Sequence, residues 1–335
     1  MEIKLQILDP GADIDFFDIY TDYDNFTTKI NINPIPVADL LSGEYVIDVP
    51  EISTIVRACP LGLCGQICED QECCKDMILT VEDTDMILEF VMTAPDLELT
   101  IPLNSARSYN MVINWGDGEP TSTVLSYNDP NATHTYSAAG TYRVSISGKC
   151  GALYFNNVGN KANLTKVIQW GEVGIESFEN SFYGCSNLVS LPEGSITGAD
   201  DVQSFKKAFQ LCTSLATIPT DLFKNIIYNR SFESTFENCS LIADIPIDLF
   251  RYNVYVRDRG FYRTFYGCSS IISIPEHLFD YNVLCTSWYQ CFHNCGALTG
   301  NAPELWITYP SANGEDCFAG CVGLTNYASI PTEWK

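Results

Sequence analysis

The chain has 335 residues, of which 46% are hydrophobic, and its 18 Lys and Arg stand against 42 Asp and Glu, a formal net charge of −24. The apolar content excludes wholesale disorder, and the length suffices for two or three domains with cores of their own. A surface this acidic repels phosphate backbones and anionic lipids, so we expect neither a nucleic acid nor a membrane as partner.

The start of the sequence predicts a protein that is made in a cytoplasm and stays soluble there. Residues 1–10 contain no basic stretch followed by an apolar core, which a secretory signal requires. No apolar run approaches the roughly 20 residues that span a bilayer. If the protein acts outside a cell, we expect a route of release other than its own signal.

Residues 1–94 are expected to form a small β-sandwich that acts as an N-terminal docking domain. Short stretches of alternating or continuous apolar residues predict strands near Ile3, Ile30, Tyr45 and Ile78. Prolines and a Ser-Gly pair between these stretches predict turns.

An acidic stretch within this segment suggests two alternatives. It contains Asp13, Asp15, Asp18, Asp22 and Asp24. Five carboxylates could bind calcium, but the spacing lacks the glycine and the closing glutamate of a calcium loop. We therefore favour a solvated acidic edge.

A cysteine cluster follows, with two interpretations. Its members are Cys59, Cys64, Cys68, Cys73 and Cys74. Four thiolates, those of Cys59, Cys64, Cys68 and Cys73, could hold a zinc ion tetrahedrally. The spacing matches no paired CxxC knuckle, so free or locally paired cysteines in an irregular loop are the favoured interpretation and zinc is the alternative.

Residues 95–149 carry the pattern of a second β domain. An apolar strand at residues 111–113 leads into Asn114-Trp115-Gly116-Asp117-Gly118, a turn signal. His134-Thr135-Tyr136 follows, and Gly140 then opens a strand in which Tyr142, Val144 and Ile146 share one face. We expect Trp115 to fill the middle of a two-sheet core.

This trio of motifs resembles the PKD family of immunoglobulin-like β-sandwiches, which carry a WxxGDG-like turn, an HxY and a GxYxV strand. The match covers about 55 residues. The resemblance implies a spacer or interaction module. Asp117 and His134 could form a catalytic pair, but we favour a structural role in which Asp117 caps the turn and His134 braces the strand before Gly140.

Residues 150–335 contain a repeat. The cysteines Cys185, Cys212, Cys239, Cys268, Cys295 and Cys321 recur at intervals of 27, 27, 29, 27 and 26, each with Phe three residues before it and Leu or Ile three residues after it. An aromatic pair and the cysteine at i, i+4, i+7 predict a two-turn helix, and the segment that follows, such as 188–192, predicts a short strand. Stacked units would bury the Phe, Cys and Leu/Ile columns in one core.

The cysteines of the repeat need no oxidation to explain them. A buried thiol behaves as a small hydrophobe with a weak S–H donor. Cys291 and Cys317 occupy equivalent positions in the last two units, so a disulfide between them is an alternative in an oxidising medium. A metal site at Cys291, His293 and Cys295 is disfavoured, because residue 293 would point away from the helical face of the other two.

These units resemble BspA-type leucine-rich repeats, and the segment 164–171 resembles the cap that precedes such repeats. The family is associated with bacterial surface adhesins and with virion proteins of tailed phages. Together the resemblances imply two small all-β immunoglobulin-like sandwiches followed by an α/β leucine-rich-repeat solenoid, with domains at 1–94, 95–149 and 150–335.

Tyrosines gather in the middle repeats and predict a recognition surface, since tyrosine offers a large contact area with a polar tip. The candidate residues are Tyr228, Tyr252, Tyr255, Tyr262, Tyr266 and Tyr281. Packing between units is the alternative role.

No catalytic constellation, cofactor loop or firm metal site is apparent, so we expect a non-enzymatic protein without a cofactor. The leading hypothesis is a structural protein of a tailed-phage virion, made in the host cytoplasm. Its N-terminal domain would contact other virion proteins, its repeats would bind a host surface protein or glycan, and it would belong to a symmetric oligomer. The alternative is a bacterial cell-surface or secreted adhesin whose signal has been removed.

Overall fold

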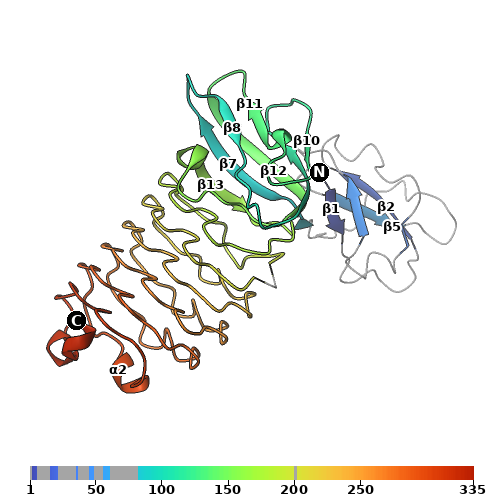
Figure 1. Cartoon of the computed structure of the whole chain (residues 1–335). Coiled ribbons are helices and arrows are strands. Elements are labelled where there is room, and N and C mark those ends of the chain that lie inside the picture. Colours follow the sequence, from blue (N-terminus) through green and yellow to red (C-terminus); the bar gives the residue numbers. More distant parts are fainter. Residues whose placement is uncertain are drawn as a thin grey trace. The chain divides into compact units, whose positions relative to one another are not determined.

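The computed structural model describes residues 84–199 and 202–335 and, within the first 83 residues, the backbone of six strands (Figure 1). The chain divides into two compact units, Met1–Thr84 and Asp85–Lys335, which are described separately. In the part of the chain so described, no helix is long and apolar enough to cross a membrane.

The first unit contains two small antiparallel sheets. In one, β1 (Glu2–Leu5) lies between β4 (Tyr45–Asp48) and β6 (Glu82–Asp83). In the other, β2 (Phe16–Thr21) lies between β3 (Ile35–Pro36) and β5 (Val56–Pro60). The strands predicted near Ile3 and Tyr45 are thus confirmed as β1 and β4. The strands predicted near residues 30 and 78, and the side chains of the acidic stretch 13–24 and of the cysteine cluster 59–74, lie outside the described residues.

The second unit begins with a five-stranded antiparallel sheet in the order β10-β9-β12-β7-β13. These strands are β7 (Met86–Met92), β9 (Tyr109–Asn114), β10 (Ser122–Val124), β12 (Gly140–Cys150) and β13 (Leu164–Gln169). A separate two-stranded ribbon pairs β8 (Glu98–Thr100) with β11 (Thr133–Thr135). The 3-10 helix η2 (Pro130–Ala132) directly precedes β11. Because β7 pairs with β12 over seven residues, residues 86–92 belong to this sheet rather than to the first unit.

Trp115 lies at the centre of this sheet region, as its place in the turn motif predicts. Its side chain is fully buried, and its indole N–H donates to Ser122 Oγ at 2.9 Å. Tyr136 packs nearby and donates its hydroxyl to the Trp115 carbonyl at 2.9 Å. Buried aromatic polar tips are thereby satisfied, as a stable core requires.

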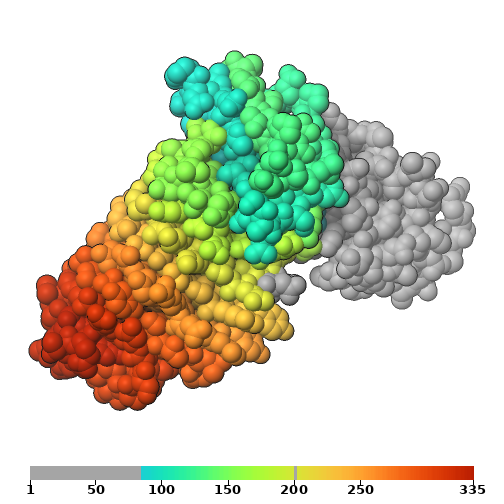
Figure 2. Space-filling model, in the orientation of Figure 1, coloured from blue at the N-terminus to red at the C-terminus, as the bar shows by residue number. Residues whose placement is uncertain are grey.

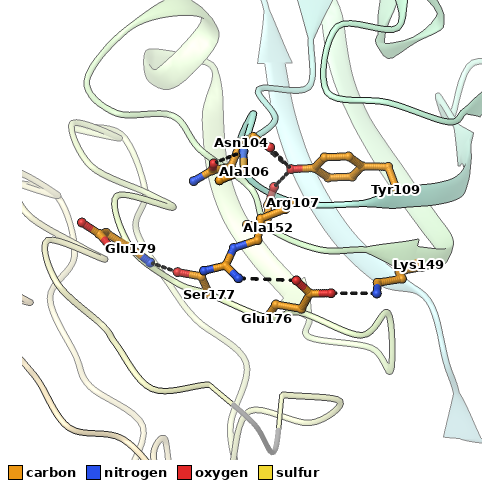
Figure 3. A network of polar contacts seen from close by, with 9 residues as sticks. All are labelled: Asn104, Ala106, Arg107, Tyr109, Lys149, Ala152, Glu176, Ser177 and Glu179. Carbon is orange, nitrogen blue, oxygen red and sulfur yellow. Dashed lines mark hydrogen bonds and ion pairs between the residues drawn. The ribbon is translucent and has the colours of Figure 1, made fainter.

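The sheet continues into the repeat region through a polar joint (Figure 3). Glu176 accepts from Lys149 at 2.7 Å and from Arg107 at 3.5 Å, and thereby links the first coil to the end of β12. The Tyr109 hydroxyl donates to the Ala152 carbonyl at 2.9 Å. One continuous hydrophobic core runs beneath this joint from the sheet to the C-terminus.

Beyond the sheet, the chain winds as successive coils that lie one upon the next in sequence order, and Figure 2 shows the same order on the molecular surface. Backbone N–H groups of one coil donate to carbonyls of the following coil, as Phe182 N does to Ala208 O at 2.8 Å and Phe209 N to Thr235 O at 2.9 Å. The side chains of the repeat motif point inward. Rings of the second Phe column stack at centroid distances of 5.4 to 5.8 Å through Phe182, Phe209, Phe236, Phe265, Phe292 and Phe318.

The predicted fold class is nevertheless wrong, because the coils are built without helices. Among the described residues of the repeats the α-helix is α2 (Leu305–Thr308), which has only four residues and lies outside the Phe-Phe-Cys segments. Two 3-10 turns, η4 (Tyr327–Ser329) and η5 (Thr332–Trp334), follow it, and η3 (Gly159–Ala162) precedes the coils. The predicted strands after each cysteine are also absent from the described coils, where only isolated bridges such as Lys166–Ser190 occur. An α/β repeat architecture is therefore replaced by stacked turns and small sheets.

The physical reason is a left-handed residue in the middle of each predicted helix. Two residues before the second Phe, φ is positive at 53° to 57°, a value that interrupts an α-helix. This column consists of Asn180, Lys207, Ser234, Arg263, Gln290 and Asp316. Each segment instead makes three-residue turns and sends its remaining N–H groups to the next coil, so both aromatic residues still face inward.

The residue before each cysteine is left-handed as well, and at five of the six positions it is glycine or asparagine. The column contains Gly184, Leu211, Asn238, Gly267, Asn294 and Gly320, with φ between 60° and 83°. A side chain on Gly267 would place Cβ 2.3 Å from the Oδ1 of Asn238 in the preceding coil. The glycine therefore serves both the backbone conformation and the close approach of adjacent coils.

The cysteine column is a ladder of buried thiols. From Cys212 onward, each Sγ of the column donates to a Phe carbonyl of the preceding coil at 3.0 to 3.2 Å, as Cys239 does to Phe209 and Cys268 to Phe236. All ten described cysteines are unpaired and buried, and these include Cys291 and Cys317, so the alternative disulfide is not formed. Burial raises the pKa of these thiols well above the usual value.

We expect the repeat thiols to be unreactive in the folded protein. Alkylation needs the thiolate, which burial suppresses for Cys239 and its neighbours in the column. Peptide mapping after iodoacetamide treatment should find the cysteines between residues 185 and 321 unmodified under native conditions and fully modified in denaturant. Modification of Cys239 at the rate of a free thiol in native buffer would contradict this structure.

The C-terminal residues close the stack. Gly314 stands in the last repeat where the other repeats have their first aromatic residue. The Trp334 ring fills this space and lies 2.2 Å from where a Cβ on Gly314 would be. Phe318 N donates to the Trp334 carbonyl at 2.8 Å and Asp316 N to Glu333 O at 3.1 Å. The last full coil thereby finds partners for amides that would otherwise point outward.

Candidate binding surface

The six tyrosines proposed as a recognition surface fall into two groups. Tyr228, Tyr252, Tyr255 and Tyr281 are between 40% and 53% exposed, a large fraction for aromatic side chains. Tyr262 and Tyr266 are half-buried on a different stretch of the coil.

The four exposed tyrosines belong to an apolar surface feature of three successive coils, which we call the aromatic ridge. Its eight side chains are 38% to 67% exposed and occupy equivalent positions two, four and five residues after a buried Phe. They are Ile227, Tyr228, Tyr252, Val254, Tyr255, Tyr281, Val283 and Leu284. Scattered apolar side chains are ordinary on a surface, but a contiguous group typically marks an interaction site.

Buried asparagines hold the three turns of the ridge together. The Asn253 side-chain amide donates to Phe223 O at 3.1 Å and to Ile226 O at 2.7 Å in the preceding coil. Asn282 repeats the arrangement one coil later, with bonds to Phe250 O at 3.1 Å and Asn253 O at 3.0 Å. Both asparagines are fully buried. The turns carrying the exposed side chains are thus fixed from beneath, which lowers the entropy that a partner must overcome.

Contacts among the exposed side chains order the ridge further. The rings of Tyr228 and Tyr255 stack with centroids 5.7 Å apart. The Arg251 guanidinium lies 5.3 Å from the Tyr281 ring and 6.0 Å from the Tyr252 ring, within cation–π range. Arg251 also pairs with Asp248 at 3.3 Å. The ridge therefore presents ring edges and hydroxyls in a preset arrangement.

Tyr262 and Tyr266 belong to a face that is closed by contacts between coils. Tyr262 stacks on Tyr289 at 4.8 Å, and Tyr266 stacks on His293 at 4.9 Å. Arg263 lies 4.0 Å above the Tyr266 ring. These pairs occupy the ring faces, so this face supports the stack rather than offering free aromatic surface.

Charges on the same face are also paired from coil to coil. Arg263 reaches the nearly buried carboxylate of Glu237 at 3.1 Å, and Lys206 reaches Glu233 at 3.3 Å. A carboxylate so poorly exposed needs its cation, because an unpaired buried charge is costly. We assign these residues a structural role.

A charge gradient runs across the three coils of the ridge. Over residues 219–231, 246–258 and 275–287 the formal charge falls from +1 through 0 to −2. The charged residues are, in chain order, Asp221, Lys224 and Arg230, then Asp248, Arg251, Arg257 and Asp258, then Glu276 and Asp280. A pocket of about 640 Å³ lies at the acidic end, lined by Glu276, His277, Asp280 and Glu304 among others.

The structure brings Asp117 and His134 together. His134 Nε2 lies 2.6 Å from Asp117 Oδ2, and the imidazole stacks on Trp115 at 5.0 Å. The other carboxylate oxygen accepts from the Glu119 amide at 3.1 Å. Asp117 thus caps its turn and fixes the histidine, the structural role that the sequence favoured. Burial opposes the charged carboxylate, but the bonds from His134 and Glu119 outweigh it and lower the pKa of Asp117.

We expect this pair to make the second unit sensitive to acid. A folded-state pKa below the ordinary 3.8 of an aspartate means that the stabilisation is complete above that value and is lost as the pH falls through the lower, folded-state pKa. Denaturation of wild type and Asp117→Asn between pH 2 and 7 should show the variant less stable at neutral pH, with the difference shrinking below pH 3.8. A difference independent of pH would contradict the assignment.

Sequence reasoning missed half of the ridge. The aliphatic members Ile227, Val254, Val283 and Leu284 and the supporting Asn253 and Asn282 were not singled out. An alignment of the units on Phe223, Phe250 and Phe279 places all of them at shared offsets. Apolar residues recurring outside the inward columns were the available signal.

Comparisons with known proteins add no family: no family model matches the chain, and no curated protein matches it. Within residues 84–199 and 202–335 there is no group of three or more His, Cys, Asp or Glu placed to hold a metal ion. The aromatic ridge is therefore the feature of the described residues that most clearly suggests a function.

Proposed function

We propose that this chain is a non-enzymatic structural protein that uses the aromatic ridge to bind another protein. The observation that carries the proposal is the alignment of eight exposed apolar side chains on three coils joined by buried asparagines. Exposing so many apolar groups is unfavourable unless a partner covers them. Tyrosines ordered before binding, with their hydroxyls outward, suit a partner that offers both apolar area and hydrogen bonds.

A protein partner fits this surface better than a glycan. Sugars stack on open ring faces, whereas Tyr228 and Tyr255 turn one face toward each other. Arg251 lies within cation–π range of the Tyr252 and Tyr281 rings. What the ridge offers is mainly edges, hydroxyls and aliphatic groups, which resembles the core of a protein interface.

We further propose that the protein is a component of a tailed-phage virion. Support comes from the resemblance of the motifs around Trp115 and of the Phe-Cys repeats to families associated with such particles. The first unit would contact other virion proteins, and the coils would contact a host molecule or a neighbouring subunit. The same resemblance supports a second candidate, a bacterial surface adhesin.

Mass spectrometry of purified virions tests the proposal. We expect peptides of this chain in particles that have been freed of lysate proteins by density gradient. Absence from the particles, together with recovery from the surface fraction of uninfected cells, would favour the adhesin. A variant with Tyr228→Ser and Tyr255→Ser should fold as the wild type does but be depleted from particles or lose its partner on cells. Unchanged incorporation or binding would reject the role of the ridge.

A further inference from the structure

We infer that the aromatic ridge is covered by the ridge of a second copy of this chain, in an antiparallel arrangement about a two-fold axis. This inference rests on the proposed function, since it names the protein partner of the same surface. Two observations carry it: the ridge is nearly self-similar about its central coil, and its charge reverses from one end to the other.

The self-similarity follows from the repeat. Four residues after Phe223, Phe250 and Phe279 stand Ile227, Val254 and Val283, respectively. Five residues after them stand Tyr228, Tyr255 and Leu284. A two-fold axis through the central coil, perpendicular to the stacking direction, sets each first coil against the third coil of the partner. Val254 would then lie against Val254 of the other copy and Ile227 against Val283, while Tyr228 would lie against Leu284.

The charge gradient selects the antiparallel orientation. One residue after each Phe stand Lys224, Arg251 and Asp280, all exposed. In the antiparallel pairing Lys224 faces Asp280 of the other copy at both ends of the interface. In a parallel pairing each coil would face its own equivalent, and the −2 coils would repel each other.

The centre of the interface tolerates the pairing. Arg251 there would approach Arg251 of the second copy, but each is already neutralised by Asp248 at 3.3 Å and lies near the rings of Tyr252 and Tyr281. The central coil carries no net charge between residues 246 and 258. Although the whole chain is strongly acidic, two copies that meet at this coil therefore repel each other little.

Charge reversal tests the orientation. Sedimentation equilibrium of the full chain in the micromolar range should show a reversible dimer. Lys224→Glu and Asp280→Lys should each raise the dissociation constant about tenfold, because each places like charges together at two symmetric positions. The double variant should return to within about twofold of wild type. If the double variant is as weak as the singles or weaker, the antiparallel pairing is wrong.

Engineered thiols give an independent readout. Under mild oxidation Val254→Cys should form a disulfide-linked dimer, while Val283→Cys, which is 67% exposed as valine, should not link to itself. Wild type under the same oxidation controls for the cysteines of residues 59–74. Equal linking of both variants would indicate a parallel pairing and overturn the inference.

Failure of this inference is distinguishable from failure of the proposed function. A wild-type chain that stays monomeric in sedimentation, with the Tyr228→Ser and Tyr255→Ser variant still losing its place in the particle, rejects the second copy and keeps the ridge as a surface for a different protein. A dimer that persists unchanged in the same variant rejects the ridge as the interface.

Discussion

Replacement of Phe236 by alanine should lower the free energy of unfolding of the repeat region by about 3 to 5 kcal/mol, the usual cost of truncating a buried phenylalanine. The ring is fully buried and stacks on Phe209 at 5.5 Å and on Phe265 at 5.7 Å. Loss of the ring leaves a cavity between two coils and removes its stacking contacts with both neighbouring rings. Urea denaturation followed by circular dichroism, with wild type in parallel, measures the difference.

Two substitutions control for this effect. Phe236→Leu keeps much of the volume and should cost less than half as much as the alanine. Tyr228→Ala removes an aromatic ring that is 53% exposed and should change stability by about 0.5 kcal/mol or less. Equal destabilisation by the alanines at 228 and 236 would mean that the Phe column is not the core of the stack.

The second large effect concerns the asparagine that supports the ridge. Asn253→Ala removes both bonds to the preceding coil and leaves Phe223 O and Ile226 O without these donors in a buried setting. Phe223 O keeps the bond from Ile226 N at 3.1 Å, so the main cost is that of the buried Ile226 carbonyl losing its donor, and a loss of about 1 to 3 kcal/mol is expected. Hydrogen exchange of the turns at 226 and 253 should quicken in the same variant.

Asn225→Ala is the matched control, because Asn225 is exposed and lies in the same turn as Ile226. We expect it to behave as wild type within about 0.5 kcal/mol. If Asn253→Ala were as mild as Asn225→Ala, the buried amide would not be what fixes the three turns.

Spacing in the sequence predicted which side chains are buried but not the backbone that buries them. The Phe three residues before each cysteine and the Leu or Ile three residues after it are buried, as expected. Phe236, Cys239 and Ile242 are one such set. The spacing i, i+4, i+7 was taken as helical, although turns interrupted by a left-handed residue place the same side chains inward. Lys207 and Arg263 adopt positive φ although neither residue type favours it, so there was no local signal in the sequence at these two positions.

The column before each cysteine did carry a signal. Glycine or asparagine stands at five of its six positions, and both residue types adopt positive φ readily. Read as left-handed positions rather than as ordinary turn residues, they would have excluded a helix that runs through the cysteine. The clustering of tyrosines in the sequence identified the tyrosines of the ridge. It did not show that Tyr255 is more exposed than Tyr262, because that depends on the position of each residue relative to the buried Phe.

The most direct test of the account compares the exposure of ridge side chains alone and in assembly. Hydroxyl-radical footprinting should modify Tyr228, Tyr255 and Tyr281 readily in the dilute isolated chain and several-fold less in purified particles, while Tyr262, half-buried in the stack, should change little. Equal modification of the three ridge tyrosines in both states would show that nothing covers the aromatic ridge, and the proposed binding role would fall.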